Sequence, residues 1–199
     1  MENQAIIWAK ENFVNEPPPQ YYCPTRDIAD GRLPKLYQEA IANGLAEEKT
    51  ALLTALAAEL TTNCFDHNLG SWKDISGCWF SFEVQNNVLR IIIADRGQGV
   101  LRSLQQADKN LTSHHDALIV ALTKQISGRQ PENRGRGLKF IMKSLNQEFP
   151  EAHFFIQTGD AKFETVFPIN ESVVASFVQD KQEFVYGTYA EVEIIMNTR

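Results

Sequence analysis

Residues 47–67 constrain the fold most, because they carry the strongest helix signal in the chain. The segment is rich in Ala, Leu and Glu, and the polar and glycine residues at 68–70 are typical of a helix end. Its apolar side chains recur at helical spacing, at Leu52, Leu53, Leu56, Leu60 and Cys64. One face of this helix must therefore be buried against another layer of structure.

Strand signals supply that second layer. Residues 78–84 and 88–94 are predicted as strands, and the second is almost continuously apolar, which is typical of a central strand. Gly159 and Asp160 form a good two-residue hairpin turn between strands at 154–158 and 161–167. The remaining predicted elements are helices at 33–42, 116–125 and 137–145 and a strand at 189–196.

This order of elements predicts an α+β fold, a two-layer α/β sandwich with a mixed, mainly antiparallel sheet and helices on one face. We expect a single domain overall. Residues 47–199 form its body, and residues 1–46 form an N-terminal segment with a Pro-rich linker and a short helix. The polar stretches 102–115 and 127–133 predict mobile loops.

Charge and cysteine content restrict the partners and the compartment. A net charge of −6 over 199 residues argues against a broad electrostatic grip on nucleic acid or anionic membrane. The 3 cysteines have no CxxC spacing, which favours a reducing compartment over a disulfide framework. The first residues lack a signal-peptide pattern and no stretch has the length of a membrane span, so we expect a cytoplasmic protein.

A first group of candidate site residues lies on the predicted long helix. Glu59, Asn63 and His67 are spaced i, i+4 and i+8, so they share a stripe beside the apolar one. A carboxylate and an amide one turn apart can hold a hydrated magnesium ion and orient a water or a hydroxyl. Considered alone, this stripe is more often an ordinary solvated face.

The second group follows the apolar strand directly, as Asp95, Arg96, Gly97, Gln98 and Gly99. A carboxylate at the end of a buried strand can accept a hydrogen bond from an adenine amino group. Gly97 and Gly99 let the backbone turn sharply and approach a planar ligand. The alternative is an ordinary turn at the end of a strand, where Asp and Gly are common.

The third group is Arg134, Gly135, Arg136, Gly137 and Leu138, at the start of a predicted helix. Glycines just before a helix expose backbone N–H groups that can wrap phosphates. Arg134 and Arg136 could neutralise a γ-phosphate there, although solvated loop charges are nearly as common. The alternative for the whole segment is a flexible loop that leads into a helix.

Taken in order, the three groups resemble the N-box, G1 box and G2 box of the GHKL superfamily, which includes gyrase, heat-shock chaperones, histidine kinases and mismatch-repair ATPases. The resemblance covers roughly residues 47–196 and implies the Bergerat ATPase form of the sandwich. Residues 100–133 fall where the family carries its ATP lid. Gly187 and Thr188 resemble the family's late Gly-Thr turn.

The resemblance implies that ATP and Mg²⁺ bind here. Asn63 would ligate the magnesium, Asp95 would bind the adenine amino group, and Gly97 and Gly99 would shape the base pocket. Phosphates would meet the G2 box, namely Gly135 and Gly137 followed by Leu138. Lys139 departs from the pattern, because many members have a further glycine at that position.

The N-box resembles that of anti-sigma-factor serine kinases most closely, because Glu59 stands where such members place a general base and His67 also fits that branch. No histidine precedes His67, so the upstream phosphoacceptor of a complete histidine kinase is missing from this sequence. We therefore expect an ATP- and Mg-binding regulatory protein that binds a protein partner, with or without phosphorylating it. A sigma factor or a STAS-like anti-sigma antagonist would be such a partner, and a homodimer is compatible with this class.

Three alternatives stay open from the sequence. The chain could be a histidine-kinase-like catalytic domain that acts on a phosphoacceptor in another chain. It could be a nucleotide-gated binding module without turnover, or a degenerate fold that binds no nucleotide. Intact Asn63, Asp95 and both glycine pairs argue against the last of these.

Overall fold

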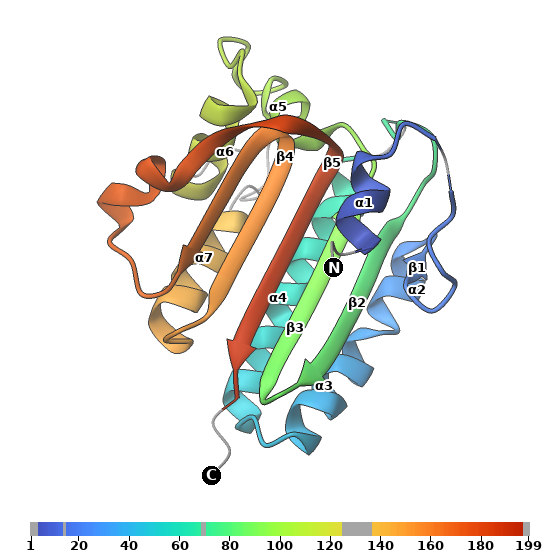
Figure 1. Cartoon of the computed structure of the whole chain (residues 1–199), viewed down its shortest axis with the longest axis vertical. Helices are drawn as coiled ribbons and strands as arrows, with labels where there is room; N and C mark the ends of the chain where they lie inside the picture. Colours follow the sequence, from blue (N-terminus) through green and yellow to red (C-terminus); the bar gives the residue numbers. More distant parts are fainter. Residues whose placement is uncertain (1–3, 14, 69–70, 125–136, 197–199) are drawn as a thin grey trace.

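The sheet is antiparallel, has five strands and follows the order β1-β2-β3-β5-β4 (Figure 1). The computed structural model describes residues 4–13, 15–68, 71–124 and 137–196. The strands are β1 (Tyr22–Cys23), β2 (Cys78–Gln85), β3 (Val88–Asp95), β4 (His153–Val166) and β5 (Val178–Ile195). The helices are α1 (Gln4–Lys10), α2 (Arg26–Asp30), α3 (Leu33–Ala42), α4 (Glu47–Asp66), α5 (Gly99–Leu104), α6 (His114–Thr123), α7 (Gly137–Glu148) and the 3₁₀ helix η1 (Glu171–Phe177).

Helices α3, α4 and α7 lie together behind the sheet as Figure 1 shows it. The apolar stripe of α4 is buried there with the inward side chains of β3, as the sequence predicted, so an α+β fold with helices packed on an antiparallel sheet is confirmed. Each leucine buried in this layer contributes about 1.5–3 kcal/mol of transfer free energy. The core of this layer includes Leu53, Leu56, Leu60, Leu89, Ile91 and Ile93.

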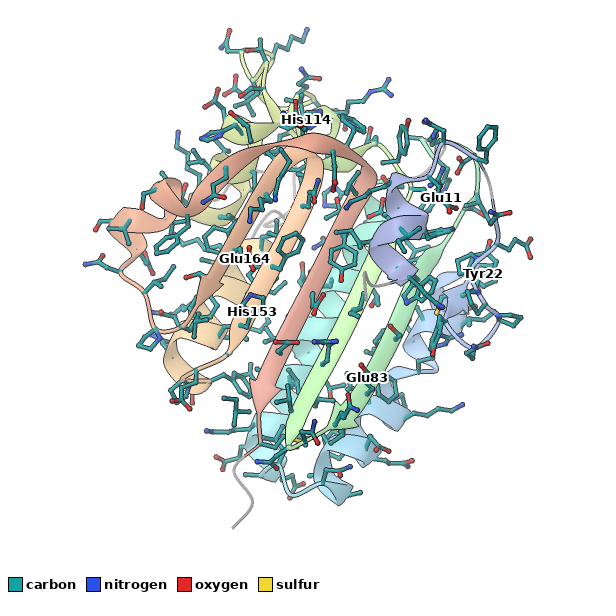
Figure 2. The ribbon with its side chains drawn as sticks, viewed as in Figure 1. Glu11, Tyr22, Glu83, His114, His153 and Glu164 are labelled. Carbon is teal, nitrogen blue, oxygen red and sulfur yellow. The ribbon has the colours of Figure 1, made fainter. Side chains whose placement is uncertain are left out.

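The expectation that helices cover only one face is wrong for α1, which packs on the opposite face against β3 and β5 (Figure 1). Trp8 of α1 is buried there with Trp79, Ile92 and Tyr189. Beyond α1 this outer face carries charged side chains, including Glu83 (Figure 2). The strand β3 is thus buried on both faces where α1 covers it, which accounts for its continuous apolar sequence.

Strand β4 folds back on itself at Gly159, whose φ is 58°. Its two ends lie side by side, because the Phe167 N–H donates to the Ala152 carbonyl at 2.9 Å. His153 and Glu164 also meet across the two legs, with Nε2 and Oε1 at 3.2 Å (Figure 2). The predicted hairpin about the Gly159 turn is therefore confirmed. Strand β5 pairs with both legs of this hairpin. Val178 pairs with Phe163 on the second leg, and Thr188 pairs with Thr158 on the first.

The prediction of a mobile polar loop at 102–115 is wrong at both of its ends. Helix α5 occupies residues up to Leu104, and α6 begins at His114. Between them, Leu104 and Leu111 are buried in a small core with Ala117 and Val120 of α6, so the segment has a packed interior of its own. The other predicted loop, 127–133, lies outside the described residues.

Among the residues that the structure describes, no helix combines the length and the apolar character needed to cross a membrane. Residues 1–46, which the sequence set apart as a leading segment, contribute α1 to the outer face and β1 to the edge of the sheet beside β2.

Candidate functional site

A cavity of about 630 Å³ lies between the last turns of α4, the end of β3 and helices α5 and α7. This volume is in the range of pockets that bind small molecules and cofactors. Residues from all three sequence motifs line it, although they are far apart in the chain. The predicted site residues in its wall are Glu59, Asn63, His67, Asp95, Gly99, Gly137 and Leu138.

The polar stripe of α4 faces this cavity. Glu59 and Asn63 are half-buried and line it together, one turn apart. Burial raises the pKa of Glu59, and the nearby Asp66 carboxylate raises that pKa further. A carboxylate with a raised pKa accepts a proton more readily near neutral pH, which suits a general base.

Asp95 lies at the end of β3 with 4% of its surface exposed. Its Oδ1 accepts a hydrogen bond from Asn68 Nδ2 at 2.8 Å and another from the Gly97 N–H at 2.8 Å. Burial raises the pKa of Asp95 to about 7, although these donors oppose the rise. The residue offers a nearly dry carboxylate to the cavity, and such a group selects ligands by hydrogen bonding.

The two glycines after Asp95 have different positions. Gly99 lines the cavity with a φ of 70°, and a Cβ there would lie 2.9 Å from Thr158 Oγ1. Gly97 is not part of the cavity wall. A Cβ on Gly97 would lie 1.9 Å from the Asn68 side chain, so this glycine makes room for Asn68. Only Gly99 is therefore in a position to shape a base pocket directly.

Gly137 is the first described residue of α7 and packs against α4. A Cβ added to it would lie 2.1 Å from Glu59 Oε1, so a larger residue at this position would displace the Glu59 carboxylate. Leu138 lines the cavity beside it. The other residues predicted to contact phosphate, namely Arg134, Gly135 and Arg136, lie outside the described residues.

His67 caps the C-terminal end of α4 and joins it to α5. Its Nδ1 lies 2.8 Å from Ser103 Oγ, and its carbonyl accepts a hydrogen bond from Gln98 Nε2. It lines the cavity, but these contacts give it a part in holding α5 against α4. Ser103 was not singled out from the sequence, and Gln98 was named only as part of the turn after the apolar strand, because no local pattern indicates which loop meets the end of α4.

Sequence reasoning also missed Asn68 and the orientation of Arg96. The Arg96 side chain is fully buried and points away from the cavity, toward the N-terminal segment. Its guanidinium donates to both carboxylate oxygens of Asp74, at 2.9 and 2.6 Å, and to the Glu11 carbonyl at 2.8 Å. The loop after β3 is therefore fixed by two sets of hydrogen bonds. Asn68 binds it on the cavity side, and the Arg96 side chain anchors it to the N-terminal segment on the other side.

The donor set of the cavity determines which metals could bind. Within the described part of the chain, no group of three or more His, Cys, Asp or Glu side chains is placed to hold a metal ion. Asn63 still offers a side-chain oxygen, and Mg²⁺ typically takes one or two such ligands and completes its shell with phosphate and water. The residues present therefore fit a magnesium ion that arrives with a phosphate-bearing ligand.

No family model matches this sequence, and no curated protein matches it.

Proposed function

We propose that this cavity binds ATP with Mg²⁺ and that the fold is of the GHKL, or Bergerat, type. The observation that supports this most is that three motifs from separate parts of the chain line one cavity. Asn63 comes from the long helix, Asp95 from the end of the central strand and Gly137 from the start of α7. A set of unrelated turns and solvated faces would have no reason to meet in this way.

The Asp95 end of the cavity takes the base. Its carboxylate accepts a hydrogen bond from the adenine 6-amino group, which carries two donors. Apolar side chains such as Ile93 and Ile156 line the same cavity and give the ring a surface to pack on. Gly99 lets the backbone lie close to the ring plane.

The Asn63 and Gly137 end takes the phosphates. Asn63 would hold the Mg²⁺, which neutralises phosphate charge during transfer of the γ-phosphoryl group. Glu59 lies on the same stripe of α4 and can accept the proton of an attacking hydroxyl or water. For a serine or threonine acceptor, the hydroxyl oxygen attacks phosphorus, the proton passes to Glu59, and ADP leaves.

At the level of the whole protein we propose an ATP-dependent regulator of the anti-sigma-factor or serine-kinase type. The half-buried Glu59 in the cavity favours chemistry over mere sensing, because its raised pKa is suited to a base. A sigma factor or a STAS-like antagonist is the partner class that follows. The second candidate is a nucleotide-gated binder without turnover, and it is favoured by the contact of α5 with the cavity, which links ligand binding to a surface helix.

The test of the site is calorimetry with ATP and ADP, each with and without Mg²⁺. We expect wild type to bind ATP more tightly with Mg²⁺ than without it. In Asn63→Ala this increment should disappear, a loss of about tenfold or more, because the amide oxygen that holds the metal is gone. Affinity measured without Mg²⁺ should change little. A full Mg²⁺ increment in the variant would remove Asn63 from the metal site.

Helices α5 and α6 should respond to the nucleotide, because Val100, Ser103 and Ala121 line the cavity. We expect backbone hydrogen exchange in both helices to slow by about tenfold when ATP and Mg²⁺ are added, since a bound ligand stabilises the closed form. Helix α3 does not line the cavity and serves as the internal control. Unchanged exchange in α5 and α6 at saturating nucleotide would show that they are not a lid.

A further inference from the structure

Asn68 follows the helix cap of α4 and lies outside the motifs on which the proposed function rests. It is 3% exposed, and its side chain makes three hydrogen bonds. Nδ2 donates to Asp95 Oδ1 at 2.8 Å and to the Cys64 carbonyl at 2.8 Å. Oδ1 accepts from the Gln98 N–H at 2.9 Å. Both N–H groups of the amide are therefore used.

The orientation of this amide is determined by its partners. The Gln98 N–H can only donate and the Cys64 carbonyl can only accept, so Asn68 must turn its oxygen to the former and its nitrogen to the latter. A flipped amide would place donor against donor. Asn68 consequently always presents an N–H to Asp95, and it cannot accept a hydrogen bond from a protonated Asp95.

Two N–H groups thus converge on Oδ1 of Asp95, one from Asn68 and one from Gly97. Donors of this kind stabilise the ionised carboxylate, whereas burial favours the neutral acid. The titratable groups that face Asp95 from other elements are the thiols of Cys64 on α4 and Cys78 on β2. Asn68 is therefore a side-chain donor that opposes the protonation of Asp95 which burial favours, and so supports Asp95 as an acceptor toward the cavity.

We propose that Asn68 is a positioning residue that makes the site selective for 6-aminopurine over 6-oxopurine nucleotides. The inference rests on the proposed function, because it takes Asp95 as the contact to the base. An ionised Asp95 accepts from a 6-amino group, but a 6-oxo group would bring its lone pairs against those of the carboxylate. A protonated Asp95 could instead donate its O–H to the 6-oxo oxygen.

Gly97 is the second part of the same arrangement. Because a Cβ at Gly97 would lie 1.9 Å from the Asn68 side chain, any larger residue there must push the amide out of place. Gly97→Ala should therefore have the same effect on base selectivity as loss of the amide, although it changes no polar group. This gives two independent variants with a single expected result.

The experiment measures the dissociation constants of ATP and ITP, which differ in the 6-amino and 6-oxo groups of the base. We expect wild type to prefer ATP, and we expect this preference to fall by about tenfold or more in Asn68→Ala and in Gly97→Ala. The matched control is Asn63→Ala, which removes an asparagine from the phosphate end. It should weaken both nucleotides in the presence of Mg²⁺ and leave their ratio unchanged.

The outcomes separate the two proposals. If wild type binds neither nucleotide, the proposed function is wrong. If wild type binds ATP and ITP equally, the function stands and the inference is overturned. Equal losses of ATP and ITP affinity in both variants, with their ratio kept, would also overturn it, because a purely structural role of Asn68 predicts that result. A melting curve for each variant identifies any that fails to fold, and the other variant then decides.

Discussion

Replacing Glu59 with Gln should lower phosphoryl transfer, or basal ATP hydrolysis, by about 10²-fold or more. The dissociation constant for ATP should stay within about twofold of the wild-type value, because an interaction made only in the transition state is removed. Glutamine keeps the length and the hydrogen-bonding reach of the side chain at the cavity wall, but it cannot take up a proton. The substitution therefore removes the carboxylate whose pKa is raised by burial, and with it the ability to accept a proton at this position.

The same helix offers a matched control. Glu48 lies in the first turn of α4, is exposed and does not line the cavity, so Glu48→Gln makes the same change of charge without touching the site. Released phosphate is the readout until an acceptor protein is known. Hydrolysis that is measurable in wild type and equal in Glu59→Gln and Glu48→Gln would exclude Glu59 as the base. The nucleotide-gated binder without turnover would then be the better proposal.

The parts of the fold that the sequence predicted depend on local periodicity. The apolar stripe of α4 and the continuously apolar sequence of β3 can both be recognised in a short window of sequence. The spacing of Glu59 and Asn63 on one helix face can be recognised in the same way. The hairpin within β4 was predictable for a similar reason, because Gly159 supplies the positive φ that its turn requires.

The elements that were missed depend on contacts made at a distance. Helix α1 has only seven residues, and its buried side chains are Ala5, Trp8 and Ala9, which have nothing to pack on until the outer face of the sheet exists. Leu111 lies between polar neighbours in the sequence, and it is buried because it packs with Leu104 and with Ala117 and Val120 of α6. Short windows of sequence contain no information about either partner.

The candidate site shows the same division. The sequence predicted that Gly97 faces a base, but the space beside this glycine is filled by the Asn68 side chain. Strands β2 and β3 separate the two residues in the chain. In the sequence, Arg96 is one residue of a turn that also contains Asp95 and two glycines. In the structure, its side chain donates hydrogen bonds to Asp74 and to the Glu11 carbonyl of the N-terminal segment. Spacing in sequence indicates which residues are near each other, but side-chain direction at a turn is decided by the packing around it.

Replacing Asp95 with Asn should weaken ATP and ADP alike, by about 10²-fold. The amide oxygen of the new residue can still accept from Asn68 and Gly97, and its NH₂ group must then face the base, where a donor meets the donors of the adenine 6-amino group. The loss should be equal with and without Mg²⁺, because the contact is to the base and not to the phosphates. This pattern is the opposite of that expected for Asn63→Ala.

The stability of the same variant shows whether it is folded and whether Asp95 is the titrating group. Burial raises the pKa of Asp95 from its ordinary 3.8 to about 7, so the folded state holds the proton more tightly than the unfolded state in this interval. The free energy of unfolding should therefore fall as the pH rises from about 4 to about 7, because the unfolded state releases the proton first. An asparagine does not titrate, and the melting temperature of Asp95→Asn should lose that part of its pH dependence. A cooperative melting curve with this weaker pH dependence shows that the variant is folded. If the folded variant still binds ATP with wild-type affinity, Asp95 is not the contact to the base.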